Sequence, residues 1–410
     1  MRPAPIAAAL LALAPPSALC ASQKLLSGAL VNRTPSPSPN APSYRDQLLR
    51  LHKSLVSIES ISGNETKVGR FLADHLQAKG YTVDRQCVAP RAGFPNDTER
   101  FNLLAWQGGK RAKARVVLTS HIDVVPPYIP YQIDHGKGPA TKDTVIKGRG
   151  SVDAKASVAA MVVALDQLLA AQAIAHDDVM LVFVVGEEVG GDGMRAFSDS
   201  LGGTAFDSVI FGEPTENKLA CGHKGGLFCE VTATGTPGHS GYPWLGKSAN
   251  ELMVRAMARL IDADLGSSDL FGNTTVNIGR FAGGVAANVI AEHALVGLAV
   301  RVAIGREEDG AKTVQRKIQA ILDQVDEEAL AIKCPQGYGP VECNCDVPDF
   351  ETIVVNYGTD VPNLKGNHTN YLYGPGSILV AHGARENLTV GDLETAVEGY
   401  KKLILHALKQ

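Results

Sequence analysis

The stretch VVLTSHID, residues 116–123, decides the fold, because an apolar run typical of a buried strand is followed directly by two candidate functional side chains. Its first part, Val116–Leu118, is short and continuously apolar, which is typical of a strand covered on both faces of a sheet. His121 and Asp123 follow at once. Three more apolar runs end in the same way: Met180–Val185 before Gly186, Glu187 and Glu188, Val209–Phe211 before Gly212 and Glu213, and Ile378–Val380 before Ala381 and His382.

Short apolar runs of this kind alternate with helical patterns over most of the chain. The predicted strands are Tyr81–Val88, Asn102–Trp106, Arg115–Thr119, Val179–Val185, Ser208–Phe211 and Ser377–Val380. A helix is predicted over Lys155–Gln172, between the third and the fourth of these strands. This alternation predicts an α/β fold with a mixed, mostly parallel sheet that carries helices on both faces. Such sheets place their functional groups at the carboxyl ends of the strands, where all four runs above end.

Residues 218–333 follow a different pattern. The predicted order is strand Gly226–Thr234, helix Ala249–Ala263, strand Thr275–Phe281, strand Ala294–Ala303 and helix Gly310–Val325. This βαββα order predicts a small ferredoxin-like α+β domain. The domain interrupts a larger one, which we place at residues 44–217 and 334–410, and two domains suit a chain of 410 residues.

The N-terminus has the composition of an export signal. Arg2 precedes an apolar run, Ala7–Ala14, and small residues follow to Ala21, which predicts a secretory signal peptide over residues 1–21. The apolar run is far shorter than the roughly 20 residues of a membrane span. A flexible lead-in, rich in serine and proline, is predicted for residues 22–43. We therefore expect a secreted, extracellular protein.

Glycosylation sequons and cysteines agree with export. The sequons lie at Asn32, Asn64, Asn96, Asn273, Asn367 and Asn387. Asn387 is close to the candidate site residue His382, so we expect it to stay unmodified. Outside the signal the chain has six cysteines, an even number that favours disulfides in an exported protein. We predict that the cluster Cys334, Cys343 and Cys345 staples one loop, and we interpret Cys229, in an apolar run, as a buried thiol.

The charge pattern argues against two classes of partner. The formal net charge is −4, and both signs are spread along the sequence. Because no basic stripe is present in the sequence, we expect binding neither to nucleic acid nor to an anionic membrane.

Taken together, the strand ends predict a metal centre. Two imidazoles and three carboxylates converge on one edge of the sheet, and Asp153 joins them from GRGSVDAK, residues 148–155, at the start of a helix. Each of these residues alone has a structural alternative. Asp153 suits a helix N-cap, His121 and His382 suit hydrogen-bonded histidines at strand ends, and Glu213 suits a solvated surface carboxylate. The adjacent acids Glu187 and Glu188 are harder to explain in this way, since they repel each other unless they are neutralised.

The donor types favour zinc, with cobalt or manganese as substitutes, because imidazole and carboxylate groups converge without a thiolate. The donors exceed what one catalytic zinc needs, which favours two ions that share a carboxylate bridge. A bridging water would lose its proton near neutral pH and act as the nucleophile. One of Glu187 and Glu188 can bind a metal while the other faces the water as the general base.

Several motifs resemble those of the co-catalytic zinc metallopeptidase family that includes glutamate carboxypeptidase, acetylornithine deacetylase, succinyl-diaminopimelate desuccinylase and aminoacylase. The motifs are SHIDVVP (120–126), GRGSVDAKAS (148–157), VVGEEVGG (184–191), FGEPT (211–215), GTPGHSGYP (235–243) and AHGARENL (381–388). The resemblance covers nearly all of the chain after Tyr44, and it implies a zinc exopeptidase-like fold. Export together with GTDVPNL (358–364) looks like secreted members described as probable carboxypeptidases.

The resemblance implies a ligand set for each metal. His121, Asp153 and Glu213 would hold one zinc. Asp153, Glu188 and His382 would hold the other, so Asp153 would be the bridge.

The resemblance also implies roles around the metals. Glu187 would be the general base and acid, and Asp123 would hydrogen-bond the imidazole of His121. In the inserted domain, His239 resembles a histidine that reaches the active site of the partner subunit and steadies the oxyanion. Asn288 matches an asparagine that contacts the substrate. The inserted domain would then be a lid and the interface of a homodimer, although His239 also suits a simple polar loop residue.

These inferences predict a secreted di-zinc metallohydrolase, a carboxypeptidase that cleaves an amide bond next to a free carboxylate in a small peptide or N-acyl amino acid. A deacylase of N-acyl amino acids or a dipeptidase remains an alternative, because spacing assigns neither Arg280 nor Arg301 to the substrate carboxylate. A two-zinc aminopeptidase is disfavoured, since such enzymes usually lack a whole domain between Glu213 and His382. An inactive binding protein on the same fold is disfavoured because every expected position is filled.

Overall fold

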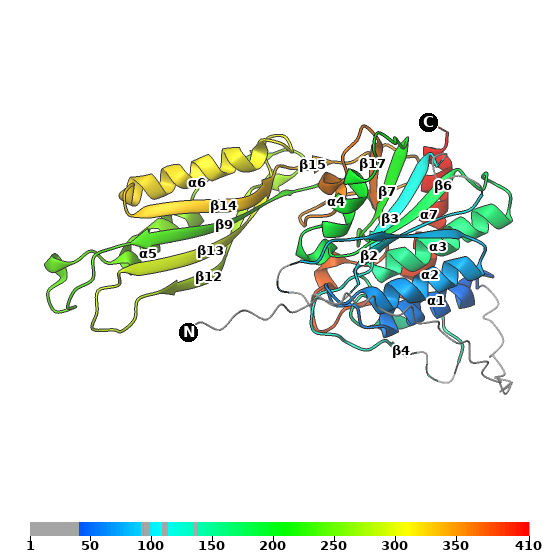
Figure 1. Cartoon of the computed structure of the whole chain (residues 1–410), viewed down its shortest axis with the longest axis horizontal. Coiled ribbons are helices and arrows are strands. Elements are labelled where there is room, and N and C mark those ends of the chain that lie inside the picture. Colours follow the sequence, from blue (N-terminus) through cyan, green and yellow to red (C-terminus); the bar gives the residue numbers. More distant parts are fainter. Residues whose placement is uncertain are drawn as a thin grey trace, which may run out of the picture. The chain divides into compact units, whose positions relative to one another are not determined.

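A computed structural model describes residues 41–409 except residues 92, 94–98, 109–113, 135 and 137 (Figure 1). The predicted signal peptide, most of the lead-in, and the sequons at Asn32 and Asn96 lie outside the described residues. Within the described part of the chain, no helix has the length and apolar character needed to cross a membrane.

The larger domain is built on a nine-stranded mixed sheet. The strand order is β1 (Thr82–Cys87), β2 (Phe101–Trp106), β6 (Val179–Val184), β3 (Val116–His121), β7 (Ser208–Gly212), β17 (Thr369–Tyr373), β8 (Leu219–His223) and β15 (Val341–Glu342), with β16 (Thr352–Val355) also paired to β8. The central strands β6, β3, β7 and β17 are parallel, and antiparallel pairs flank them. The predicted mixed α/β sheet is confirmed, and its parallel part is the centre.

Side chains of the central strands alternate between two hydrophobic cores. Val116 and Leu118 of β3 belong to one core, whereas Val117 belongs to the other, which also contains Met194 and Phe197. The first core is covered by α1 (Arg45–Ser57), α2 (Thr66–Ala78), α3 (Lys155–Ala170) and α7 (Val390–Ala407), and the second by α4 (Asp192–Asp199). Because both faces are covered, β3, β6 and β7 are buried at every position, and β6 is apolar throughout.

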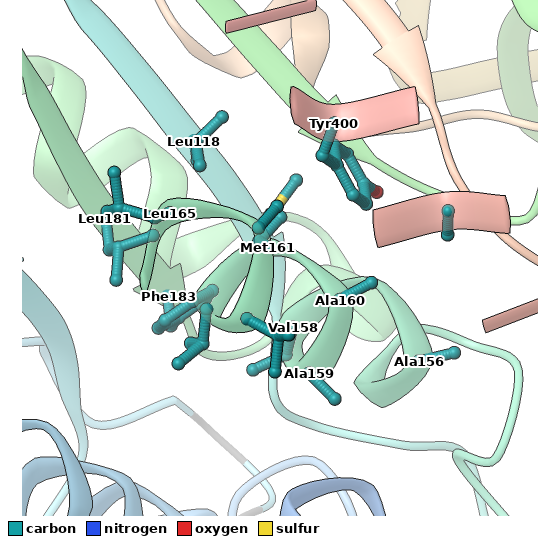
Figure 2. Packing of buried hydrophobic residues seen from close by; sticks show 14 of the residues in the cluster. Leu118, Ala156, Val158, Ala159, Ala160, Met161, Leu165, Leu181, Phe183 and Tyr400 are labelled. Atoms are coloured by element: carbon teal, nitrogen blue, oxygen red, sulfur yellow. The ribbon is translucent and has the colours of Figure 1, made fainter. Parts of the chain in front are cut away.

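Helix α3 is almost entirely apolar from Ala156 to Leu165, because every residue of this stretch is buried. Figure 2 shows Met161 and Leu165 of α3 among Leu118 of β3, Leu181 of β6 and Tyr400 of α7. This packing fixes the N-terminal end of α3, directly after the loop that carries the candidate bridging aspartate.

The inserted domain has a hydrophobic core of its own. Its elements are β9 (Gly225–Thr234), α5 (Ala249–Ile261), the short hairpin β10 (Ser267–Ser268) and β11 (Gly272–Asn273), β12 (Thr275–Gly283), β13 (His293–Val302), α6 (Gly310–Asp326) and β14 (Leu330–Tyr338). The sheet order β12-β13-β9-β14, antiparallel throughout, is the ferredoxin-like order, as predicted. The predicted βαββα pattern omits β14, whose apolar rhythm is broken by Pro335 and Gly337 and which continues this sheet past residue 333.

The prediction of a strand at Ser377–Val380 is wrong. Ile378–Val380 is a single 3-10 turn. The strand of this region is β17, which ends at Tyr373, before this turn begins. Pro375 and Gly376 end the extended chain, and the hydroxyl of Ser377 accepts the backbone N–H of Leu379 at 3.3 Å. The apolar run looks like a strand, but Leu379 is 86% exposed.

A small three-stranded sheet completes the larger domain. Its order is β18 (Asn387–Thr389), β5 (Val145–Lys147) and β4 (Gln132–Asp134), all antiparallel. Each strand has three residues, which is too short to leave a periodic signal in the sequence.

Two disulfides connect neighbouring segments of the sheets. They are Cys221–Cys345, which ties β8 to the segment after β15, and Cys229–Cys334, which ties β9 to β14. The predicted local staple among Cys334, Cys343 and Cys345 is therefore wrong, and so is the interpretation of Cys229 as a thiol. The pairs follow the order of strands in space, which brings together cysteines more than a hundred residues apart. Among the described cysteines, Cys87 and Cys343 are free.

Candidate active site

Three parallel strands bring their carboxyl ends together. β3 ends at His121, and β7 is followed directly by Glu213. β6 is followed by a short 3-10 turn, Glu187–Val189, which begins after Gly186. Gly186 adopts a φ of 73°, a backbone conformation that glycine accepts without steric cost, so the chain can bend sharply here.

Asp153 lies between the two histidines. Its Oδ1 is 3.1 Å from His121 Nε2, and its Oδ2 is 3.2 Å from His382 Nε2. Glu188 Oε2 lies 3.0 Å from His382 Nε2, and Glu213 Oε1 lies 3.9 Å from His121 Nε2. Ligand atoms within each of the two groups lie within 4.8 Å of one another. The structure thus brings the five expected ligands together in two groups that share Asp153.

The hydrogen bonds of His121 show that these groups suit a cation. Its Nδ1 donates to the backbone carbonyl of Asp123 at 3.0 Å, which leaves a lone pair on Nε2 in the neutral ring. That lone pair faces the carboxylates of Asp153 and Glu213. Among the described residues, Oε1 of Glu188 is buried without a hydrogen-bond partner. Imidazole nitrogens and carboxylate oxygens in this arrangement fit zinc.

The pKa values reflect the same excess of negative charge. Burial raises the pKa of Glu213 well above its usual range, although His121 opposes the rise. Burial and the charge of Asp153 raise the pKa of Glu188. Hydrogen bonds to Asp153 and Glu188 raise the pKa of His382 to about 10. The metal-free groups therefore hold protons that a bound cation would replace.

Asp123 orients the turn that carries the adjacent acids. Its Oδ1 accepts the backbone N–H of Glu187 at 3.2 Å, and its Oδ2 accepts that of Glu188 at 3.3 Å. The hydroxyl of Ser62 also donates to Oδ2 at 2.7 Å. The carboxylate is 3.6 Å from Nδ1 of His121, too far for a hydrogen bond. The expected contact between Asp123 and His121 thus runs through the backbone carbonyl, and the side chain positions Glu187 instead.

A cavity of about 730 Å³ lies over these groups. Glu187 lines it, and burial together with the nearby Glu213 raises the pKa of Glu187 well above its usual range. Arg301 of β13 also lines the cavity and is partly buried. Its neighbour in register on β9 is Gly226, which has no side chain to cover the guanidinium. Within the described part of the chain, Arg301 forms no ion pair.

His239 and Asn288 lie together in the inserted domain. The backbone N–H of Ser240 donates to the carbonyl of Asn288 at 3.1 Å, and His239 forms a β-bridge with Val289. The N–H of Gly241 donates to Nδ1 of His239 at 3.0 Å, so Nε2 carries the proton of the neutral ring. Both side chains are exposed, and neither is among the described residues that line the cavity. The structure does not bring them to the two ligand groups of the same chain.

The described sequons differ in exposure. Asn64, Asn273 and Asn367 are exposed, whereas Asn387 is half-buried. The side-chain amide of Asn387, the group that would carry a glycan, donates to the carbonyl of Arg385 at 2.6 Å. Which of these sequons is modified stays a prediction.

Comparison with known proteins identifies the family. A protein of Sordaria macrospora that contains a peptidase M20 domain is 54% identical over 397 residues, which cover 91% of this chain and 88% of the relative. The chain belongs to the M20 peptidase family. A probable carboxypeptidase of Aspergillus oryzae is 45% identical to the M20 chain over 406 residues, with 93% of each covered. Residues 221–330 match the family model of a peptidase dimerisation domain, and residues 102–210 match that of peptidase family M28.

Solved structures share the fold of this M20 peptidase. A tripeptidase from Staphylococcus aureus superposes with a TM-score of 0.73 at 21% identity, covering 89% of this chain and 99% of the other. A dinuclear metal-binding M20 peptidase from Bacillus subtilis superposes with a TM-score of 0.63 at 14% identity, covering 90% and 99%. The family and the fold together make this chain a peptidase.

Sequence reasoning left Arg301 without a role in this M20 peptidase. The sequence feature that could have indicated a role for Arg301 is its single charge within the apolar run LAVRVAI, residues 298–304. A charged residue in a half-buried strand is costly unless it faces solvent, a partner or a ligand. Only the register of β13 on β9 places that charge in the cavity that the candidate metal ligands line.

Proposed function

We propose that this M20 peptidase is a two-zinc carboxypeptidase that hydrolyses the amide bond next to the free C-terminal carboxylate of a small peptide. One observation carries the proposal: the two oxygens of Asp153 face two different imidazoles, each within its own group of three donors. A carboxylate in that position suits a bridge between two ions.

The proposed ligands form two groups of three residues, one group for each ion. His121, Asp153 and Glu213 would hold one ion, and Asp153, Glu188 and His382 would hold the other. A bound zinc pair would supply Lewis-acid activation, which would make water acidic enough to lose a proton near neutral pH.

Glu187 is the proton carrier of the proposed reaction. It lines the same cavity, but it belongs to neither group of candidate ligands, so its carboxylate is free to act on the water. It accepts a proton from the attacking water and returns that proton to the amide nitrogen as the bond breaks. The hydrogen bond from its backbone N–H to Asp123 holds it in place during both transfers.

Arg301 recognises the substrate carboxylate in this proposal. A guanidinium matches the two oxygens of a carboxylate with paired hydrogen bonds, and a partly buried site strengthens them. A cavity of about 730 Å³ suits a short substrate, so the chemistry also serves an N-acyl amino acid or a dipeptide.

The test is a panel of an N-acyl amino acid, a dipeptide and a longer peptide, each as free acid and as C-terminal amide, with and without a chelator. We expect hydrolysis of free acids alone, loss of activity with chelator, and loss of at least a hundredfold in Glu187→Gln. Arg301→Met should raise KM for free acids, whereas Arg280→Met, an exposed arginine of β12, should not. Equal cleavage of acids and amides would refute the substrate class.

We further propose that the enzyme is a homodimer in which His239 serves the partner's site. The match of residues 221–330 to a peptidase dimerisation domain supports this, as does the exposure of His239. Mixing Glu187→Gln and His239→Ala variants should restore activity, because a hybrid dimer contains one complete site. Absence of any restoration in a mixture that exchanges subunits would contradict the proposal.

We also propose that the enzyme is secreted. The two disulfides suit an oxidising compartment, in agreement with the leader-like residues 1–21. Mass spectrometry of the native extracellular protein should find a mature N-terminus beyond residue 21, and an intact intracellular chain would refute secretion.

A further inference from the structure

Two candidate ligands lie in loops next to the same end of the small three-stranded sheet, at its strands β5 and β18. β5 ends at Lys147, and the loop after it leads to Asp153. β18 begins at Asn387, and the loop before it contains His382. The two strands pair antiparallel, with Asn387 opposite Lys147, so both loops start from the same pair of residues.

Glu386 joins these two loops from the inside. Its side chain is fully buried. Its Oε1 accepts the backbone N–H of Val152 at 3.0 Å and that of Asp153 at 3.2 Å. Its Oε2 accepts from the guanidinium of Arg149 at 2.7 Å. A single carboxylate therefore fixes the backbone of the candidate bridging residue.

Arg149 extends the connection to His382. Its Nη2 donates to the backbone carbonyl of His382 at 3.3 Å, and its Nε donates to that of Pro127 at 3.3 Å. His382 has a φ of 61°, a left-handed conformation that a residue other than glycine keeps only when its surroundings hold it. The bond from Arg149 is one of those restraints.

We propose that Arg149 and Glu386 form a clamp that supports the metal site of Asp153, Glu188 and His382 more strongly than the other site, which shares only Asp153 with the clamped loops. The inference rests on the proposed two-metal function. The group of Asp153, Glu188 and His382 takes two of its three donors from the clamped loops. The group of His121, Asp153 and Glu213 takes one, because its other two donors follow strands β3 and β7 of the main sheet.

The variant Glu386→Gln tests the clamp by metal titration. It keeps the size of the side chain but places an amide against a buried guanidinium. Zinc affinity would be measured by competition with a chromophoric chelator, without any substrate. We expect one of two sites to weaken about 10–100-fold, the range for partners that orient a metal ligand, and the other to change much less.

Glu394→Gln is the matched control. Glu394 forms another buried ion pair with an arginine, Arg45, between α7 and α1. Its loss should lower the urea midpoint of the metal-free protein while leaving both zinc affinities unchanged. If Glu394→Gln and Glu386→Gln weaken the same site equally, the clamp is only a source of general stability and the proposal fails.

Arg149→Lys gives a second measurement if Glu386→Gln does not fold. An ammonium can keep the ion pair with Glu386 but cannot also reach both carbonyls, so the same site should weaken. Two unchanged affinities, or equal weakening of both sites, would overturn the proposal. A wild-type protein that binds fewer than two zinc ions would instead refute the proposed function on which it rests.

Discussion

The environment of His223 predicts how the stability of the metal-free protein depends on pH. This histidine ends β8 and is fully buried. Its Nδ1 donates to the carbonyl of Lys224 at 2.9 Å, and its Nε2 lies 3.0 Å from the hydroxyl oxygen of Thr359. That oxygen already accepts the backbone N–H of Val361, so its proton is free to point at Nε2. The neutral ring is therefore satisfied, and burial lowers the pKa of His223 to about 4.

The magnitude follows from the two pKa values. Between pH 6.5 and about pH 4 the unfolded chain binds this proton and the folded chain does not. Stability must therefore fall as the pH falls through that window and level off below it. At about 1.4 kcal/mol per pKa unit, His223 alone should remove about 2 kcal/mol between pH 7 and pH 5, and about 3 kcal/mol by pH 4.

The assay is urea denaturation of the metal-free protein at pH 7, 5 and 4, in a Trp244→Phe background that leaves Trp106 of β2 as the fluorescent reporter. His223→Gln keeps a neutral donor and acceptor but does not titrate. The wild type should lose about 2 kcal/mol more than this variant between pH 7 and pH 5. His293→Gln, at a side chain 72% exposed, should follow the wild type. Parallel pH dependence in wild type and His223→Gln would refute the reasoning.

Three other predictions concern the site and its support. Zinc binding should release protons at neutral pH and tighten as the pH rises, because burial raises the pKa values of Glu188 and Glu213. Titration calorimetry that gives the same heat in buffers of different ionisation enthalpy would contradict this. Asp123→Asn should lower kcat about 10–100-fold, since an amide has one acceptor oxygen in place of the two that accept the N–H groups of Glu187 and Glu188. Steady-state kinetics on a variant with an unchanged circular dichroism spectrum will measure the effect. An unchanged kcat would exclude the role given to Asp123. Gly212→Ala should cost about 1–3 kcal/mol in urea denaturation, because the added Cβ would lie 2.7 Å from both Met161 and Ser157; full stability would mean that α3 can move away from β7.

The parts of the fold that could be predicted are the strands whose burial is visible in the local sequence as a continuous apolar run. Val116–Leu118 and Val179–Val185 are continuous apolar runs because each face of the sheet meets a different core. Ile378–Val380 has the same composition but forms an exposed turn, and composition alone does not distinguish the two. Disulfides were expected, but their pairing was missed for a related reason: the pair Cys229–Cys334 depends on which strands become neighbours.

His121, Glu188 and Glu213 could be predicted because the carboxyl ends of parallel strands converge. His382 was expected at a strand end as well, but it follows a 3-10 turn. The residues that support the candidate ligands could not be predicted. Arg149 and Glu386 meet only because two three-residue strands pair, and strands of that length leave no periodic signal. The side chain of Asp123 was expected on His121, but the bend at Gly186 brings two backbone N–H groups closer to it.

The position of β17 in the main sheet has a consequence for how the protein is made. This strand lies between β7 and β8, yet it is synthesised after the whole inserted domain. A growing chain emerges N-terminus first, so β7 and β8 leave the ribosome without the strand that separates them. His382 comes later still. We expect a nascent chain to have at most one of the two ligand groups, so chains arrested before Thr369 should be hydrolytically silent. The order of strands thus keeps the peptidase inactive until its own synthesis is nearly complete.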